Sequence, residues 1–389
     1  MTAVARAEIY LDYAATSPLD PAVAAEMTDC MTREFANPSS AHEPGRRARR
    51  LVETAREQVA ARVGAPAERI VFTSGATESN NLALKGALRG GRARPHLVTS
   101  RIEHKSVLDT AHALEGAGVA VTYVDCDAGG RVAPAAIAAA IGPDTALVSV
   151  MHVNNETGVI QDIEGIGTIC RERGVWFHVD AAQSAGKVPL RLDGSTVDLC
   201  SLTGHKVCGP KGVGALYVAP GVLLAPQLHG GEQERGLRAG TLATHQVVGL
   251  GKAYELADPA AEAPRLAGLR DRLWEALRAI PAVRLNGAAE HLAPHILNVT
   301  FPGAEGESLR LALRDLAVSA GSACAADSPD ASHVLRGLGL SDALASSSLR
   351  FSVGRFTTEA EVVAAAARVA AEVGRLRDLA KSAPAWCSF

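Results

Sequence analysis

The chain has 389 residues, 47% of them hydrophobic, and a formal net charge of −3. This length suits two domains with a sizeable core, and the charge excludes a broad basic surface for nucleic acid. The arginine cluster at residues 46–50 is interpreted as the solvated face of a helix. No apolar run approaches the ~20 residues that cross a membrane, and the first eight residues lack a signal-peptide core. The seven scattered cysteines lack zinc-like spacing, so we expect a reduced, cytoplasmic protein without a metal site.

Short β-like runs alternate with helical segments over the first two thirds of the chain. Helices are predicted at residues 21–31 and 46–63, and β-like runs at 70–73, 97–100, 119–125, 146–153, 175–181, 199–203 and 214–218. This alternation indicates a mainly parallel sheet with helices on both faces. The last two runs are too close for a crossover helix, so we expect them to pair antiparallel or lie apart. The result is a mixed sheet of about seven strands.

The pattern changes from about Asp258, after which a Pro/Ala-rich linker is predicted. A helix is expected at residues 263–280 and another at 359–379, with short β-like runs at 283–286, 296–301, 318–320 and 349–353. This mixture is typical of a smaller α+β domain. We therefore expect an N-terminal arm (1–16) joining the small domain, a large domain (17–257) that contains the mixed sheet, and a small C-terminal domain (258–389).

Two of the β-like runs end in residues suited to one type of chemistry. Lys206 follows the run that ends at Thr203, and the carboxyl ends of strands in open α/β sheets face the ligand crevice. Lysine amines there can form Schiff bases with aldehydes. Asp180 ends an earlier run and could hold a pyridine nitrogen protonated. Lys211, inside a Gly-Pro turn, is the weaker alternative for the anchor.

A third strand end predicts a phosphate site. The run at residues 70–73 is followed by Gly75, Ala76 and Thr77, which open a helix. A helix N-terminus offers N–H donors and a positive dipole end to a phosphate. We therefore assign Ala76 and Thr77 to the phosphate, together with Thr203 and His205 beside the lysine.

These blocks, with those at residues 10–16 and 356–359, resemble the cysteine desulfurases of the class V aminotransferase family, and the similarity covers nearly the whole chain. The resemblance implies a homodimer with the aspartate aminotransferase-like fold (fold type I) and pyridoxal 5'-phosphate as cofactor. It also implies conversion of L-cysteine to L-alanine, with an enzyme persulfide that passes sulfur to an acceptor protein. The pathway stays open between iron–sulfur cluster assembly, tRNA thiolation, DNA phosphorothioation and related routes.

The resemblance also implies roles for residues outside the three strand ends. Gln183 would face the phenolic oxygen of the cofactor. His104 would stack on its ring and help move protons, which suits a flat group that titrates near neutral pH. Arg350 would bind the substrate carboxylate with help from Asn155. Thr241 would complete the phosphate site of the neighbouring subunit.

Cys324 is the nucleophile that the resemblance implies. It lies among small residues and helix breakers, and composition alone favours an inert cysteine. The match to the family's Gly-Ser-Ala-Cys block favours a persulfide-forming thiolate instead, in the long-loop branch that serves many partners. His104 is the expected acceptor of the thiol proton. Cys208, where the family usually has a bulky residue, is interpreted as a packing residue, although a second thiol could alter sulfur transfer.

Two alternatives remain from the sequence. One is a related transaminase or lyase in which Cys324 is a spectator, which amino-group transfer to a keto acid would identify. The other is a catalytically silent sulfur-transfer scaffold, which an absorbance change with cysteine would exclude.

Overall fold

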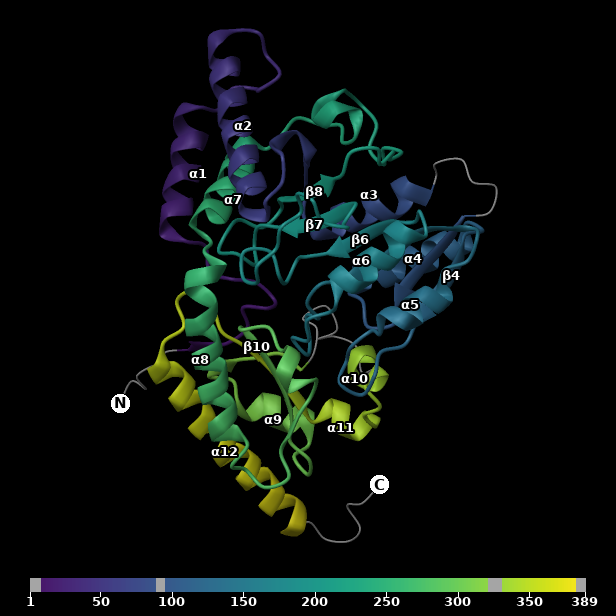
Figure 1. The fold of residues 1–389 in the computed structure, drawn as a ribbon. Helices are drawn as coiled ribbons and strands as arrows, with labels where there is room; N and C mark the ends of the chain where they lie inside the picture. Colours follow the sequence, from purple (N-terminus) through teal and green to yellow (C-terminus); the bar gives the residue numbers. More distant parts are fainter. Residues whose placement is uncertain (1–7, 89–94, 321–330, 383–389) are drawn as a thin grey trace.

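The computed structural model describes residues 8–88, 95–320 and 331–382 (Figure 1). A seven-stranded sheet in the order β2-β8-β7-β6-β5-β3-β4 forms its larger part. The strands are β2 (Ile70–Thr73), β3 (His96–Ser100), β4 (Ala120–Val124), β5 (Thr145–Met151), β6 (Trp176–Asp180), β7 (Leu199–Thr203) and β8 (Gly214–Val218). β8 runs antiparallel to both of its neighbours, and the other pairs are parallel. The predicted mixed sheet is confirmed, and of the two arrangements expected for its last two strands the structure has the antiparallel pair.

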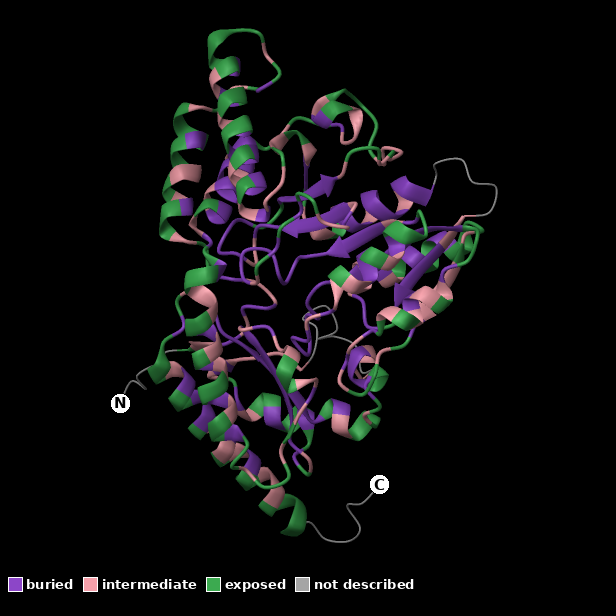
Figure 2. Cartoon of the chain, viewed as in Figure 1, coloured by how far each residue is buried: buried purple, intermediate pink, exposed green. Residues whose placement is uncertain are grey.

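Helices cover this sheet, and its central strands are buried along their whole length (Figure 2). Burial on both faces explains why these strands are nearly continuous apolar runs. The helices of this part are α1 (Pro21–Arg33), α2 (Glu43–Val63), α3 (Ala76–Leu88), α4 (Lys105–Gly116), α5 (Pro134–Ala140), α6 (Ile163–Glu172) and α7 (Thr244–Leu256). Both helices predicted before the first sheet strand are confirmed, the second beginning three residues earlier than expected.

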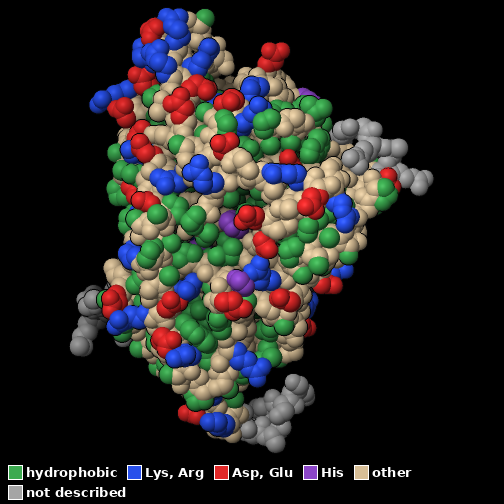
Figure 3. All heavy atoms as spheres, in the orientation of Figure 1, with side chains coloured by type: hydrophobic (Ala, Val, Ile, Leu, Met, Phe, Trp, Pro, Cys, Tyr) green, Lys and Arg blue, Asp and Glu red, His purple; other side chains and the backbone are tan. Residues whose placement is uncertain are grey.

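The arginine cluster lies on α2, where most of its side chains face solvent. Arg46 pairs with Glu43 at 2.8 Å and Arg47 with Glu34 at 2.9 Å. Figure 3 shows positive and negative side chains mixed over the visible face. This arrangement agrees with a solvated helix face rather than a nucleic-acid surface.

The smaller part is built on an antiparallel sheet in the order β12-β10-β9. Its strands are β9 (Arg284–Leu285), β10 (Ile296–Thr300) and β12 (Ser348–Ser352), and its helices are α8 (Pro259–Leu277), α9 (Gly306–Ala312), α10 (His333–Gly337), α11 (Asp342–Ser346) and α12 (Glu359–Ser382). A short parallel pair, β1 (Ile9–Tyr10) with β11 (Leu316–Ala317), holds the N-terminal segment against this part. A separate leucine-rich cluster forms its core.

Two predictions in this region are wrong. The linker expected before residue 263 is the first turn of α8, because Asp258 accepts the N–H groups of Ala260 and Ala261 and Pro259 suits the first helical position. The strand expected at residues 318–320 lies at Leu316–Ala317, and Ser319 makes only an isolated bridge to Arg350. The domain boundaries at residues 16 and 257 stay predictions.

Within the described ranges, no helix combines the length and apolar character that a bilayer crossing requires.

Candidate active site

A cavity of about 500 Å³ opens at the carboxyl ends of β6 and β7. Most of the predicted site residues line it: Ala76, Thr77, His104, Asn155, Asp180, Gln183, Thr203, His205, Lys206 and Arg350. Lys211 lines it as well. Thr241 does not; it borders a separate hollow beside Phe35. Cys324 lies outside the described residues. Most residues predicted from the sequence therefore line one cavity, and the role of each residue stays a prediction.

Asp180 is fixed at the end of β6 by two hydrogen bonds. Its Oδ1 accepts the Ala182 N–H at 2.9 Å, and its Oδ2 accepts the Asn80 side-chain amide at 2.8 Å. The carboxylate is 5% exposed. Asp180 is thus held rigidly at the base of the cavity.

The turn before α3 brings backbone N–H groups to another wall of the cavity. Gly75 has φ +148°, which favours glycine. A Cβ at Gly214 would lie 2.7 Å from the Gly75 Cα, so β8 can approach this turn only with glycine. The first N–H groups of a helix have no intrahelical acceptor. Those of Ala76 and Thr77 therefore suit an anion.

His205 precedes the lysine and connects it to the N-terminal segment. Its carbonyl oxygen accepts the Ser17 N–H and hydroxyl, both at 2.8 Å, and its ring lies 3.2 Å from the Thr16 hydroxyl. Burial, followed by the charges of Lys206 and Lys211, lowers the pKa of His205 to about 4. His205 is therefore neutral near pH 7.

Arg350 is 1% exposed and projects from β12 into the cavity. Its Nη1 donates to the Asn155 carbonyl at 2.7 Å, and its Nη2 donates to Asp12 at 2.9 Å and to the Ser319 hydroxyl at 3.1 Å. Its Nε has no hydrogen-bond partner among the residues that the structure describes. One donor of this buried guanidinium is thus left for a ligand.

Within the described part of the chain, two further buried atoms of the cavity wall lack hydrogen-bond partners, Asn155 Oδ1 and Gln183 Oε1. The Gln183 amide nitrogen donates to the Ala14 carbonyl at 2.8 Å. Buried polar atoms are normally satisfied, so these atoms and the Arg350 Nε indicate a polar ligand. A lysine, a fixed carboxylate and an anion-binding helix start complete a donor set that fits pyridoxal 5'-phosphate together with an amino acid.

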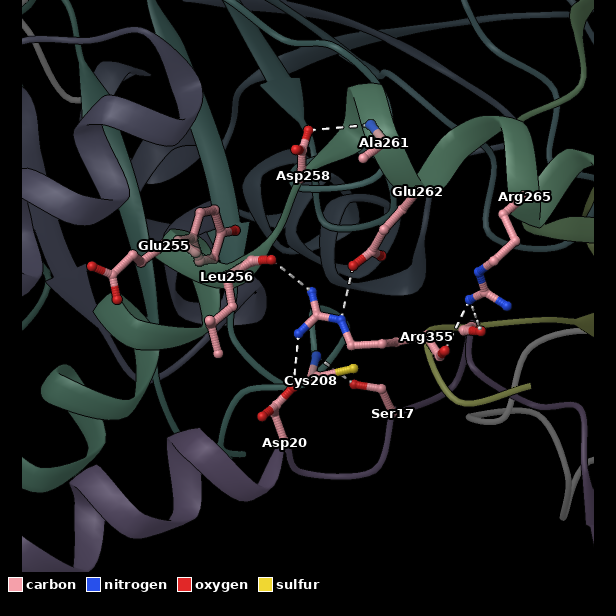
Figure 4. Close-up of polar contacts among 12 residues, drawn as sticks. Ser17, Asp20, Cys208, Glu255, Leu256, Asp258, Ala261, Glu262, Arg265 and Arg355 are labelled. Carbon is pink, nitrogen blue, oxygen red and sulfur yellow. Dashed lines mark hydrogen bonds and ion pairs between the residues drawn. The ribbon is translucent and has the colours of Figure 1, made fainter. Parts of the chain in front are cut away.

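Cys208 is buried and does not line the cavity. It has a left-handed φ of 62°, and its N–H donates to the Ser17 hydroxyl at 2.8 Å. Burial raises the pKa of its thiol. Beside it, Arg355 bridges Asp20 and Glu262 at 2.9 Å each (Figure 4). These surroundings support the packing interpretation of Cys208.

Sequence reasoning missed five polar residues in or beside this site: Asp12, Asn80, Glu103, Ser106 and Lys187. Asp12 lies in the block at residues 10–16, and Asn80, Glu103 and Ser106 lie within three residues of Thr77 or His104, so a polar side chain close to a predicted site residue was the available signal. Lys187 gave no signal, because nothing in the sequence predicts its burial. Among the described residues, no group of His, Cys, Asp and Glu side chains could hold a metal ion.

Comparisons with known proteins show the family of the chain. The aminotransferase class-V family model matches residues 9–364. The chain is 53% identical over 386 residues to the cysteine desulfurase IscS of Escherichia coli O139:H28. This alignment covers 97% of the present chain and 95% of the relative.

Solved structures agree with the fold. A NifS-like protein has a TM-score of 0.87 at 34% identity, covering 97% of this chain and 100% of its own. SspA in complex with cysteine has a TM-score of 0.81 at 41% identity, and the match covers 90% of this chain and 99% of its own. The expected fold type I is therefore confirmed. The chain belongs to the aminotransferase class-V family and, within it, to the cysteine desulfurases, which use pyridoxal 5'-phosphate.

Proposed function

We propose that this chain converts L-cysteine to L-alanine and receives the substrate sulfur on Cys324 as a persulfide. One observation carries the proposal: a single cavity is lined by Lys206, Asp180, the start of α3 and, across from the sheet, the buried Arg350. The 53% identity to a protein named as a cysteine desulfurase supports the choice of substrate.

Lys206 would hold the cofactor covalently, and Asp180 would pair with its ring nitrogen. Bound there, pyridoxal 5'-phosphate would supply an electron-accepting ring that stabilises negative charge at the substrate Cα. Gln183 would face the phenolic oxygen and His104 the ring. The phosphate would be bound by Ala76, Thr77, Thr203 and His205.

Arg350 would bind the substrate carboxylate, with its unpartnered Nε as one donor. The Asn155 side-chain oxygen, also without a partner, would help to orient the amino acid. Asp12 already shares the guanidinium. It keeps the planar donor group in position, so little side-chain freedom is lost when substrate binds.

The sulfur step balances without an external oxidant. The Cys324 thiolate attacks the substrate sulfur, a sulfur–sulfur bond forms, and the substrate Cβ–S bond breaks. The bonding electrons stay on carbon, and Cβ takes up one proton and becomes the methyl group of alanine. Each sulfur loses one electron and Cβ gains two. The persulfide then serves a sulfur-acceptor protein.

The proposal includes a homodimer in a reduced, cytoplasmic setting. Thr241 borders a hollow that also contains Phe35, whose side chain is 82% exposed. Its place in a separate hollow, outside the cavity lining, supports the expectation that Thr241 serves the phosphate site of a second subunit. The described cysteines are free, which suits a reducing compartment.

The test combines product analysis with one variant. With L-cysteine, the wild-type holoenzyme is expected to form alanine and protein-bound persulfide. Cys324→Ala should bind cofactor and change its visible absorbance with cysteine, but accumulate no persulfide, whereas Cys208→Ala should behave as wild type. Robust persulfide in Cys324→Ala would overturn the assignment. Amination of a keto acid without sulfur transfer would indicate a transaminase. A visible absorbance that does not change when cysteine is added would indicate a silent scaffold.

A further inference from the structure

A continuous hydrogen-bonded chain joins His104 to Asp180 through two side chains that the proposed reaction does not use. The His104 Nδ1 lies 2.8 Å from the Ser106 hydroxyl oxygen. That oxygen lies 2.8 Å from the Asn80 amide nitrogen, which also lies 2.8 Å from Asp180 Oδ2. The four residues come from α3, from the end of β6 and from the start of α4.

The direction of each hydrogen bond follows from the chemistry of the groups. An ionised carboxylate only accepts hydrogen bonds, so the nitrogen of the Asn80 amide must face Asp180. Its second hydrogen then donates to the Ser106 oxygen. The Ser106 hydroxyl hydrogen is directed to His104 Nδ1, because that nitrogen already accepts the Ser106 backbone N–H and therefore carries no proton of its own to donate.

A second donor reaches the same ring nitrogen. His104 is the N-cap of α4, and its Nδ1 accepts the backbone N–H of Ser106 at 3.1 Å. A nitrogen that accepts two hydrogen bonds carries no proton. Neutral His104 therefore has its proton on Nε2, the ring nitrogen away from Ser106.

Protonation of Nδ1 would disrupt this arrangement. The new N–H would face the Ser106 backbone donor, and the hydroxyl would have to rotate away. The charged groups around the ring act in both directions: Lys206 and His333 oppose a positive His104, whereas Asp180 and Asp109 favour it. Burial is the largest influence, and the net effect lowers the pKa of His104.

We propose that Asn80 and Ser106 are positioning residues that hold His104 in its neutral form with the proton on Nε2, under the control of the Asp180 carboxylate. The tautomer of His104 is inferred from the hydrogen bonds alone, and only its meaning for the reaction rests on the proposed function. In the substrate-free enzyme His104 offers a hydrogen-bond donor to the cavity, in place of the proton acceptor expected from the family resemblance.

The test reads the histidine ring directly. The holoenzyme is labelled with ¹⁵N-histidine, and long-range ¹H–¹⁵N correlations, which distinguish the two tautomers from imidazolium, are recorded against pH without cysteine. His104→Gln identifies the His104 signals among the 12 histidines. The wild type is expected to show the Nε2–H form at neutral pH.

The variants separate positioning from simple packing. Ser106→Ala removes the hydroxyl donor and should raise the pKa of His104 by about one pH unit, because one hydrogen bond to the neutral form is lost. Ser106→Thr keeps the hydroxyl and should restore the wild-type value. Asn80→Ala removes the amide that donates to the Ser106 oxygen, which leaves this oxygen free to accept a hydrogen bond from protonated His104. This variant should therefore also raise the pKa of His104. Unchanged cofactor absorbance and melting temperature show that each variant is folded.

An Nδ1–H or imidazolium signal in the wild type at neutral pH would overturn the proposal. So would a pKa in Ser106→Ala or Asn80→Ala equal to that of the wild type. Because no cysteine is present, these results do not depend on desulfuration. Failure of the proposed function would appear separately, in the alanine and persulfide measurements.

Discussion

The burial of Lys187 gives the most quantitative prediction. Its side-chain nitrogen has no hydrogen-bond partner in residues 8–88, 95–320 and 331–382, and the residue is 7% exposed. Burial, followed by repulsion from Lys206, lowers its pKa from 10.5 to about 7. Cys208 and Glu262 oppose this effect, and Arg350 adds to it. The folded protein therefore holds an ammonium group here at a cost in stability.

The sign follows from proton binding. Between pH 7 and 10.5 the unfolded chain keeps the proton that folded Lys187 has lost, so stability rises with pH across this window. The full cost, present below pH 7, is about 5 kcal/mol, at about 1.4 kcal/mol for each tenfold step. At pH 9 about 2 kcal/mol of this stability cost remains, and above pH 10.5 the cost disappears.

Lys187→Met removes the charge and keeps a side chain of similar shape. With about 2.1 cal/mol/K per residue of unfolding entropy, a 389-residue chain that unfolds cooperatively should gain about 6 °C in Tm at pH 6 and 2 to 3 °C at pH 9. Circular dichroism melts of the holoenzyme across this range measure both. Lys381→Met is the matched control, because that side chain is 77% exposed. A Tm difference independent of pH, or a loss of stability at pH 6, would refute the reasoning.

Two other substitutions test the buried groups beside the cavity. Burial raises the pKa of Glu103 to about 8, so the folded state keeps a proton that the unfolded chain loses above its ordinary value, and stability falls as pH rises toward 8. Glu103→Gln, which mimics the protonated acid, should match wild-type Tm at pH 5 and exceed it above pH 8; an equal difference at both pH values would contradict this. Arg350→Lys loses the planar donor group, and should lower kcat/KM for L-cysteine about 10- to 100-fold, mainly through KM. Arg375→Lys, on an exposed side chain, is its control, and an unchanged KM for Arg350→Lys would argue against carboxylate binding there.

The sheet was largely predictable because local physics determines it. β2, β7 and β8 have the predicted bounds, since each is an apolar run between turns. The short connection limited β7 and β8 to antiparallel pairing or to separate positions, and the structure shows the antiparallel pair. The start of α8 was missed because Asp258-Pro259 is typical of a linker and of a helix start alike, and only the observed cap distinguishes them.

The cavity was predictable for a related reason. Asp180 and Lys206 end strands of one sheet, and strand ends meet at one edge. Contacts between distant segments were not predictable. Asn80 and Asp180 are 100 residues apart, and Arg350 meets Asp12 across 338 residues. Such pairs depend on tertiary packing, which leaves no local periodicity in the sequence.

The most direct test of the central claim follows one sulfur atom. L-cysteine carrying isotopic sulfur is added to the holoenzyme, free thiols and persulfides are trapped, and the cysteine-containing peptides are analysed by mass spectrometry. We expect one labelled sulfur on the Cys324 peptide, matched by an equal amount of alanine, and no label on the Cys208 peptide. Two results would contradict this expectation. In one, alanine forms and the labelled sulfur is found on another cysteine; in the other, alanine forms and the labelled sulfur is released without passing through Cys324.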